Sequence, residues 1–195
     1  MNQGAFLRLF AAVDLSAEAR EAIAAQQKRI AAALAASGSS MKWVKPEQAH
    51  LTLVFLGNVD ASRAATVVET VARNVDLAPF DMVLEGVGVF PPRGAPRVLW
   101  VGVDGGAQEV TALQREMASR VGGLGIALED RPFSPHLTIG RWRESRPPDR
   151  ERAIGGASRG VLARVRVESA TLYQSQLSSA GPAYTALAHA NLTPR

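Results

Sequence analysis

The sequence predicts an α+β protein of two similar lobes, in which antiparallel sheets flank a central cleft and helices lie on the outside. Strand and helix patterns are mixed without regular βαβ alternation, and no glycine-rich fingerprint follows the first strand, which argues against a doubly wound nucleotide fold. A four-residue motif occurs twice, as His50-Leu51-Thr52-Leu53 and His136-Leu137-Thr138-Ile139, each with a proline four positions ahead. This repetition indicates an internal duplication within one bilobal domain spanning residues 1–195.

Apolar spacing and turn residues predict five elements in the first half of the chain. Leu7 to Val13 alternate with more polar side chains, which is typical of a strand with one buried face. Ser16 is the expected N-cap of the helix that follows, and Ser37-Gly38 ends that helix. The expected elements, in order, are a strand at 7–13, a helix at 17–36, a short strand at 41–44, a strand at 50–56 closed by Gly57-Asn58, and a helix at 61–74.

Strands dominate the second half. A Pro91-Pro92-Arg93-Gly94 turn predicts a hairpin, because Pro and Gly favour tight turns. Residues 144–160 are polar and rich in Pro, Arg and Gly, which predicts a loop with a short helix. The expected elements are strands at 80–90 and 97–103, a helix at 107–121 stopped by Gly122-Gly123, the strand of the second motif, and strands at 162–173 and 183–190 separated by a Ser-Ser-Ala-Gly-Pro turn.

The composition is that of a globular protein. A chain of 195 residues with 47% hydrophobic content is long enough for one domain or two intimately packed lobes. There is no cysteine, which excludes disulfides and thiolate metal sites. No apolar stretch reaches the length needed to span a bilayer, and no cleavage-type segment is present at the amino terminus. We therefore expect a cytoplasmic protein without membrane association, and a monomer.

The cations are mostly arginines. The formal net charge is +4, from 22 Lys and Arg against 18 Asp and Glu. Arginine forks suit phosphate recognition, although a high arginine content is also compatible with an ordinary solvated surface. A cluster brackets the second motif and outnumbers the nearby acids: Arg131, Arg141, Arg143, Arg146, Arg150 and Arg152. A polyanionic ligand would be attracted to this region.

The paired motifs carry the chemistry. Successive side chains of a strand point to opposite faces, so His and Thr of each motif share one face while the aliphatic residues fill the other. Two such strands facing one cleft would place two imidazoles and two hydroxyls around a small anion. Histidine titrates near neutrality, so one ring can act as base and the other as acid on opposite sides of a phosphorus atom. Thr52 and Thr138 could then donate hydrogen bonds to the non-bridging oxygens.

Other uses of these residues fit less well. A lone histidine on a strand is usually structural, and His189 has no Thr two positions on, so we interpret it as structural. A metal site needs three or four converging ligands, and no Asp or Glu lies within four residues of His50 except Glu47, which precedes it in the Pro46 turn. Ser134 lacks the sharp glycine-flanked turn that exposes a serine nucleophile. We therefore predict neither a metal nor a cofactor.

These residues resemble the two-histidine phosphoesterases, and their flanking segments resemble the branch of RNA 2′,3′-cyclic phosphodiesterases, also described as 2′-5′ RNA ligases. The resemblance covers nearly the whole chain. The segments that carry it are Arg8-Leu9-Phe10-Ala11-Ala12-Val13-Asp14-Leu15, Trp43 to Gly57, Gly88-Val89-Phe90-Pro91, Arg97-Val98-Leu99-Trp100, Phe133 to Arg141 and Leu172-Tyr173-Gln174-Ser175.

The resemblance implies that His50 is the proton donor, that His136 is the proton acceptor, and that Thr52 and Thr138 hold the phosphate. It also implies two similar α+β lobes around a basic cleft and no metal. The implied reaction hydrolyses a terminal 2′,3′-cyclic phosphate of RNA to a 2′-phosphate, with the donor protonating the departing 3′ oxygen.

Three further residues are candidates for substrate binding. Arg141 follows the second motif, but strict alternation from His136 would point it away from the cleft, so its use requires a kink that Gly140 could allow. Phe10 and Phe133 could stack a terminal base, with core packing as the equal alternative for each.

The expected partner is RNA with a 2′,3′-cyclic phosphate end, such as a tRNA half or an oligonucleotide. Three alternatives remain open at this point: ligation of such an end to a 5′-hydroxyl as a 2′-5′ linkage, phosphodiester hydrolysis of a small cyclic nucleotide, and a non-catalytic module that binds RNA ends.

Overall fold

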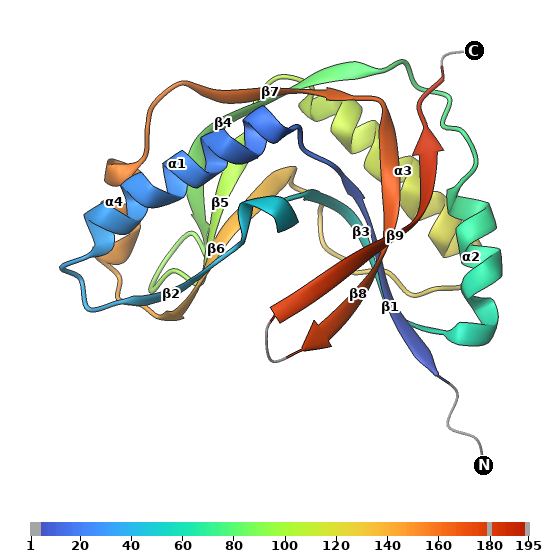
Figure 1. The fold of residues 1–195 in the computed structure, drawn as a ribbon, viewed down its shortest axis with the longest axis horizontal. Coiled ribbons are helices and arrows are strands. Elements are labelled where there is room, and N and C mark those ends of the chain that lie inside the picture. The colour runs from blue at the N-terminus through green and yellow to red at the C-terminus, as the bar shows by residue number, and fades with distance from the viewer. Residues whose placement is uncertain (1–4, 179–180, 194–195) are drawn as a thin grey trace.

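A computed structural model of the chain describes residues 5–178 and 181–193 and contains two antiparallel sheets (Figure 1). The four-stranded sheet A has the order β3-β1-β8-β9, and the five-stranded sheet B has the order β2-β6-β5-β4-β7. The strands of sheet A are β1 (Phe6–Val13), β3 (Leu51–Asp60), β8 (Ser169–Ser178) and β9 (Gly181–Asn191). Those of sheet B are β2 (Ser40–Trp43), β4 (Phe80–Phe90), β5 (Val98–Val103), β6 (His136–Glu144) and β7 (Val161–Val167).

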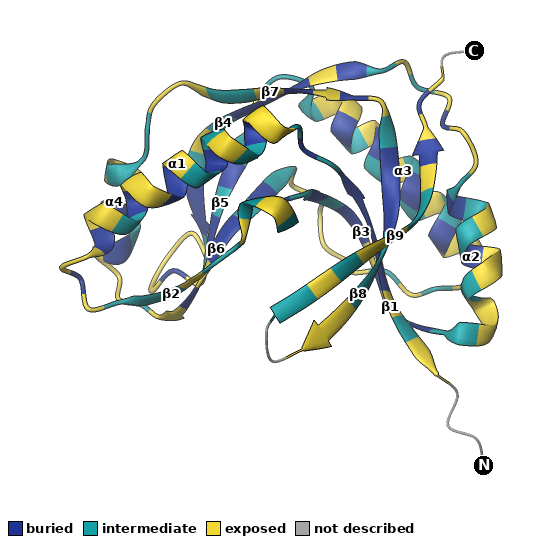
Figure 2. Ribbon diagram, viewed as in Figure 1, coloured by how far each residue is buried: buried dark blue, intermediate teal, exposed yellow. Residues whose placement is uncertain are grey.

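Helices cover the outer face of each sheet. Helix α1 (Ala17–Leu34) contacts α4 (Asp149–Gly156) and β7, whereas α3 (Ala107–Gly123) contacts β3 and α2 (Ala64–Val71). Each helix turns its buried residues toward the sheets and its exposed residues outward (Figure 2). The Ser16 hydroxyl caps α1 by accepting a hydrogen bond of 3.2 Å from the Ala19 amide. The predicted α+β class with two antiparallel sheets and outer helices is confirmed.

Several predicted boundaries are wrong, and the largest error concerns residues 162–173. This apolar run is not one strand: it divides after Val167 into β7 of sheet B and β8 of sheet A. The strand of the first motif continues through Gly57-Asn58 to Asp60, because both residues stay paired with β1. Residues 61–63 form a 3-10 turn ahead of α2, and α3 extends through both glycines to residue 123. Two residues of the predicted 178–182 turn, 179 and 180, lie outside the described residues.

The two sheets are joined beside the repeated motifs. Strand β2 pairs with β6 in sheet B, after which the chain passes through the 3-10 turn Pro46–Gln48 into β3 of sheet A. The Val44 amide donates to the Ile139 carbonyl at 3.1 Å. The buried Gln27 side chain donates from Nε2 to the carbonyls of both Val44 (2.7 Å) and Ile139 (2.9 Å). These bonds fix the segment leading into β3 against the first half of β6, and β3 and β6 contact each other.

None of the helices in the described part of the chain is both long enough and apolar enough to span a membrane.

Candidate active site

The two motif histidines make the same local hydrogen bond. Nδ1 of His50 lies 2.8 Å from the Gln48 carbonyl oxygen, and Nδ1 of His136 lies 2.7 Å from that of Ser134. A carbonyl oxygen can only accept, so Nδ1 carries the proton in both rings. Nε2 of each ring is therefore the atom that can give or take a proton in a reaction.

Burial around the two motifs follows one pattern. Leu51, Leu53, Leu137 and Ile139 are buried, whereas His50, Thr52, His136 and Thr138 are half-buried. The same order of buried, half-buried and exposed side chains runs through nine consecutive positions, from His50 to Asn58 and from His136 to Glu144. The predicted alternation is confirmed, and the two strands present equivalent faces.

A β-bulge lies at the same place in both strands. The pairing of β3 with β1 skips Leu53, and the pairing of β6 with β5 skips Ile139. One extra residue reverses the alternation, so the fifth position after each histidine turns to the histidine face. That position is Phe55 in β3 and Arg141 in β6, and both are exposed.

The kink that Arg141 required is therefore present. Without it Trp142 would share the face of His136, but Trp142 is only 9% exposed. Gly140 permits the close approach of β2 at this point, since a Cβ there would lie 2.6 Å from Sδ of Met41.

Aromatic side chains surround each histidine ring. Phe10 stacks on His50 with ring centroids 4.8 Å apart, and Tyr184 meets the same imidazole edge-on at 5.2 Å. In sheet B, the ring centroids of Phe90 and Trp100 lie 5.2 and 6.3 Å from that of His136.

The prediction that Phe10 stacks a terminal base is wrong. The residue is only 3% exposed, because its ring packs against the rings of His50, Tyr173 and Tyr184, so the packing alternative holds. Phe133 is half-buried and packs against the core, and its base-stacking role stays a prediction.

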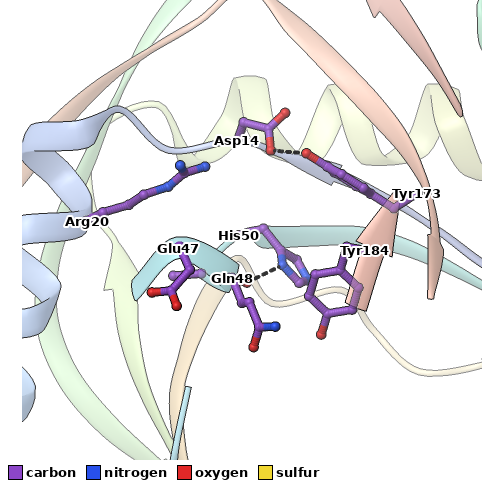
Figure 3. A pocket seen from close by; sticks show the side chains of 8 residues that line it. Asp14, Arg20, Glu47, Gln48, His50, Tyr173 and Tyr184 are labelled. Atoms are coloured by element: carbon purple, nitrogen blue, oxygen red, sulfur yellow. Dashed lines mark hydrogen bonds between the residues drawn. The ribbon is translucent and has the colours of Figure 1, made fainter. Parts of the chain in front are cut away.

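A cavity of about 270 Å³ opens beside His50 (Figure 3). Its lining comes from the end of β1, the first turn of α1, the turn before β3 and the β8–β9 hairpin. The residues are Asp14, Arg20, Glu47, Gln48, Ala49, His50, Tyr173 and Tyr184.

Asp14 is held in this cavity by two hydroxyl groups. The Tyr173 hydroxyl donates to Oδ1 at 2.6 Å, and the buried Thr171 hydroxyl donates to Oδ2 at 2.7 Å. Because the Thr171 hydrogen is used in this way, Nδ1 of His189, 3.0 Å from the same hydroxyl, must be the donor to it. His189 thus supports this network, in agreement with its structural interpretation.

Burial lowers the pKa of His50 from its ordinary value, since it penalises the charged imidazolium. The Gln48 carbonyl and the Asp14 carboxylate oppose this shift by favouring the charged ring. Burial, the Tyr173–Asp14 hydrogen bond and the Asp14 charge together raise the pKa of the Tyr173 hydroxyl, which therefore stays protonated as a donor.

Two arginines from different sheets act on Tyr184. Burial raises the pKa of its hydroxyl, and the positive charges of Arg141 and Arg8 partly offset that rise. Arg141 belongs to β6 of sheet B, whereas Arg8 and Tyr184 belong to sheet A. Charges from both sheets therefore act on the Tyr184 hydroxyl.

We expect Asp14→Asn to lower the pKa of His50 further, because it removes the nearby negative charge that favours the imidazolium. The pH titration of the His50 Hε1 resonance by NMR measures this shift. Thr171→Val, which removes one hydrogen bond but keeps the carboxylate, should change the titration less. An unchanged His50 pKa in Asp14→Asn would contradict the electrostatic role of Asp14.

Asp14, Tyr173 and Tyr184 line the cavity but were not predicted as site residues.

Within residues 5–178 and 181–193, no three His, Asp or Glu side chains lie close enough together to hold a metal ion.

Residues 21–178 match the 2′-5′ RNA ligase superfamily. The chain belongs to this superfamily. A relative from Archaeoglobus fulgidus, named RNA 2′,3′-cyclic phosphodiesterase, is 36% identical over 91% of the chain and 96% of that protein. A relative of the same name from Methanothermobacter thermautotrophicus is 34% identical over 92% of the chain and 95% of its own length.

Two solved structures have a similar fold. TT0787 of Thermus thermophilus superposes with a TM-score of 0.77 at 30% identity, covering 96% of the chain and 99% of that protein. E. coli LigT complexed with 3′-AMP also gives 0.77, at 26% identity over 97% of the chain and 99% of LigT.

Proposed function

We propose that the protein hydrolyses the 2′,3′-cyclic phosphate at the end of an RNA to a 2′-phosphate. The observation that carries this proposal is the matched pair of histidines: each has Nδ1 committed to a backbone carbonyl and Nε2 available, on equivalent faces of β3 and β6. The superfamily and the names of the relatives from Archaeoglobus and Methanothermobacter support it.

In this mechanism the two rings exchange protons with opposite ends of the reacting phosphate. Nε2 of His136 takes a proton from water as its oxygen attacks phosphorus. The bond from phosphorus to the 3′ oxygen breaks, and Nε2 of His50 delivers its proton to that oxygen. The product carries a 2′-phosphate and a 3′-hydroxyl, and water restores the two protonation states.

Three side chains are assigned to the phosphate. Thr52 and Thr138 lie on the histidine faces, so their hydroxyls can donate to the non-bridging oxygens as negative charge develops. The bulge turns Arg141 to the same face as His136, where its guanidinium can neutralise the anion.

The electrostatics of His50 fit a donor that is charged by its substrate. Burial lowers its pKa in the ligand-free protein, which favours the neutral ring. A phosphodiester anion bound against Nε2 favours the imidazolium instead and raises the pKa of His50. Substrate binding would therefore promote protonation of the ring that acts as donor.

Ligation of the same end to a 5′-hydroxyl, giving a 2′-5′ linkage, is the second candidate. It is the same displacement at the same phosphate, with the 5′-hydroxyl of a second RNA attacking in place of water, and the superfamily is named for it. The same two histidines would serve in this transfer.

The test uses a short RNA that ends in a 2′,3′-cyclic phosphate, with ³¹P NMR of the product in the presence of EDTA. We expect a 2′-phosphate monoester at an undiminished rate. A 3′-phosphate product would overturn the donor and acceptor assignment, and absence of turnover would overturn the function. Adding an RNA with a 5′-hydroxyl and sizing the products on a gel measures ligation.

A further inference from the structure

We infer that the histidine face of sheet A continues beyond the reacting phosphate as a platform for single-stranded RNA. Phe55 would stack the base of the nucleotide that precedes the cyclic end, and Arg8 would pair with the phosphate of that nucleotide. The inference rests on the proposed function and names the side chains that would hold the RNA chain beyond its cyclic end.

Phe55 is an aromatic side chain exposed in the middle of a strand. It is 48% exposed, while its neighbours Val54 and Leu56 are buried. The bulge at Leu53 turns it to the face of His50 and Thr52, away from the core. It extends a continuous aromatic cluster, since its ring lies 6.2 Å from Phe10.

The pleat places Arg8 on the same face. Arg8 and Phe10 are two positions apart on β1, so their side chains point to one side of the sheet. Arg8 is exposed, pairs in register with Asn58 and is close enough to Tyr184 to influence its hydroxyl. Within the part of the chain that the structure describes, Arg8 makes no ion pair. Its charge is available to an external anion.

Comparison of the two lobes indicates that Phe55 contacts a base and not a phosphate. Phe55 and Arg141 occupy equivalent positions after the same bulge, five residues beyond their histidines. One lobe therefore presents a guanidinium at this position, which suits a phosphate, and the other presents a ring, which suits a base.

The distance along β3 suits an adjacent nucleotide. Phe55 is three residues beyond Thr52, which corresponds to at most about 10 Å along a strand. The occupant that fits an exposed aromatic ring with an exposed arginine on the same face is single-stranded RNA, because bases stack on aromatic side chains while cations follow the phosphates.

The test compares two substrates: cytidine 2′,3′-cyclic phosphate and a tetranucleotide with the same cyclic end. We expect the wild type to have a higher kcat/KM on the tetranucleotide. Phe55→Leu should reduce that advantage about ten-fold, in line with the loss of one stacked base, and leave turnover of the mononucleotide unchanged. Phe55→Tyr should preserve the advantage of the tetranucleotide. Arg8→Gln should reduce the slope of log affinity against log salt concentration for the tetranucleotide by about the value of one phosphate contact.

The matched control is Ile154→Ala, which removes another exposed apolar side chain, on α4. It should leave both rates at the wild-type level. Equal wild-type rates on the two substrates, or an equal loss on both in Phe55→Leu, would overturn the inference and leave the proposed function intact.

If the wild type turns over neither substrate, the proposed function fails instead. Binding of the tetranucleotide with a 3′-hydroxyl end then decides on the platform: Phe55→Leu must weaken it, and unchanged binding would overturn the inference.

Discussion

His50→Ala and His136→Ala are each expected to lower kcat about 10²- to 10⁴-fold, since each removes one positioned proton transfer. Both rings have the protonated Nδ1 and the available Nε2 that this role requires. Steady-state kinetics on cytidine 2′,3′-cyclic phosphate measures the loss. The double variant should lose less than the product of the two single effects, because the two groups act in one step.

The third histidine provides the control. His189 bonds through Nδ1 to Thr171 and should tolerate replacement by alanine with most of the activity retained. Near wild-type rates in either His50→Ala or His136→Ala would mean that the acid and base assignment is wrong.

Thr52→Val and Thr138→Val should each lower kcat about 10²- to 10³-fold, because each removes one hydroxyl donor to the phosphate oxygens. Valine keeps the shape of threonine, and both residues are half-buried on the histidine faces, so the fold should be preserved. Serine at either position should restore most of the rate. A rise in KM with unchanged kcat would instead show that the hydroxyls bind substrate and transition state equally.

The sequence predicts what depends on local spacing. The alternation of buried and half-buried residues through Leu53 and Ile139 could be predicted because side chains of a strand alternate with period two. The reversal immediately beyond these residues could not, because a bulge arises from pairing with a neighbouring strand that is distant in sequence. The exposure of Phe55 is therefore a tertiary property.

The burial of Phe10 depended on tertiary structure for the same reason. Phe10 lies on the histidine face, yet the β8–β9 hairpin and the His50 ring cover it. The division of the 162–173 run is also invisible in the sequence, since its apolar pattern continues across both sheets.

One signal in the sequence was available and missed. Leu9-Phe10 and Val13-Asp14 recur 90 positions later as Leu99-Trp100 and Val103-Asp104, and a helix begins three residues after each aspartate. Each strand supplies an aromatic ring that lies beside its histidine. This longer repeat would have extended the duplication from the two motifs to a strand–helix–strand unit.

The chain alternates between the two sheets, and this alternation couples the two lobes. The backbone passes between sheets A and B four times, before β2, β3, β4 and β8, so neither lobe is a continuous stretch of sequence. Unfolding of one lobe would therefore disrupt the strand pairing of the other. We expect the protein to denature in a single cooperative transition. We therefore expect the two copies of the duplicated unit to behave as one folding unit.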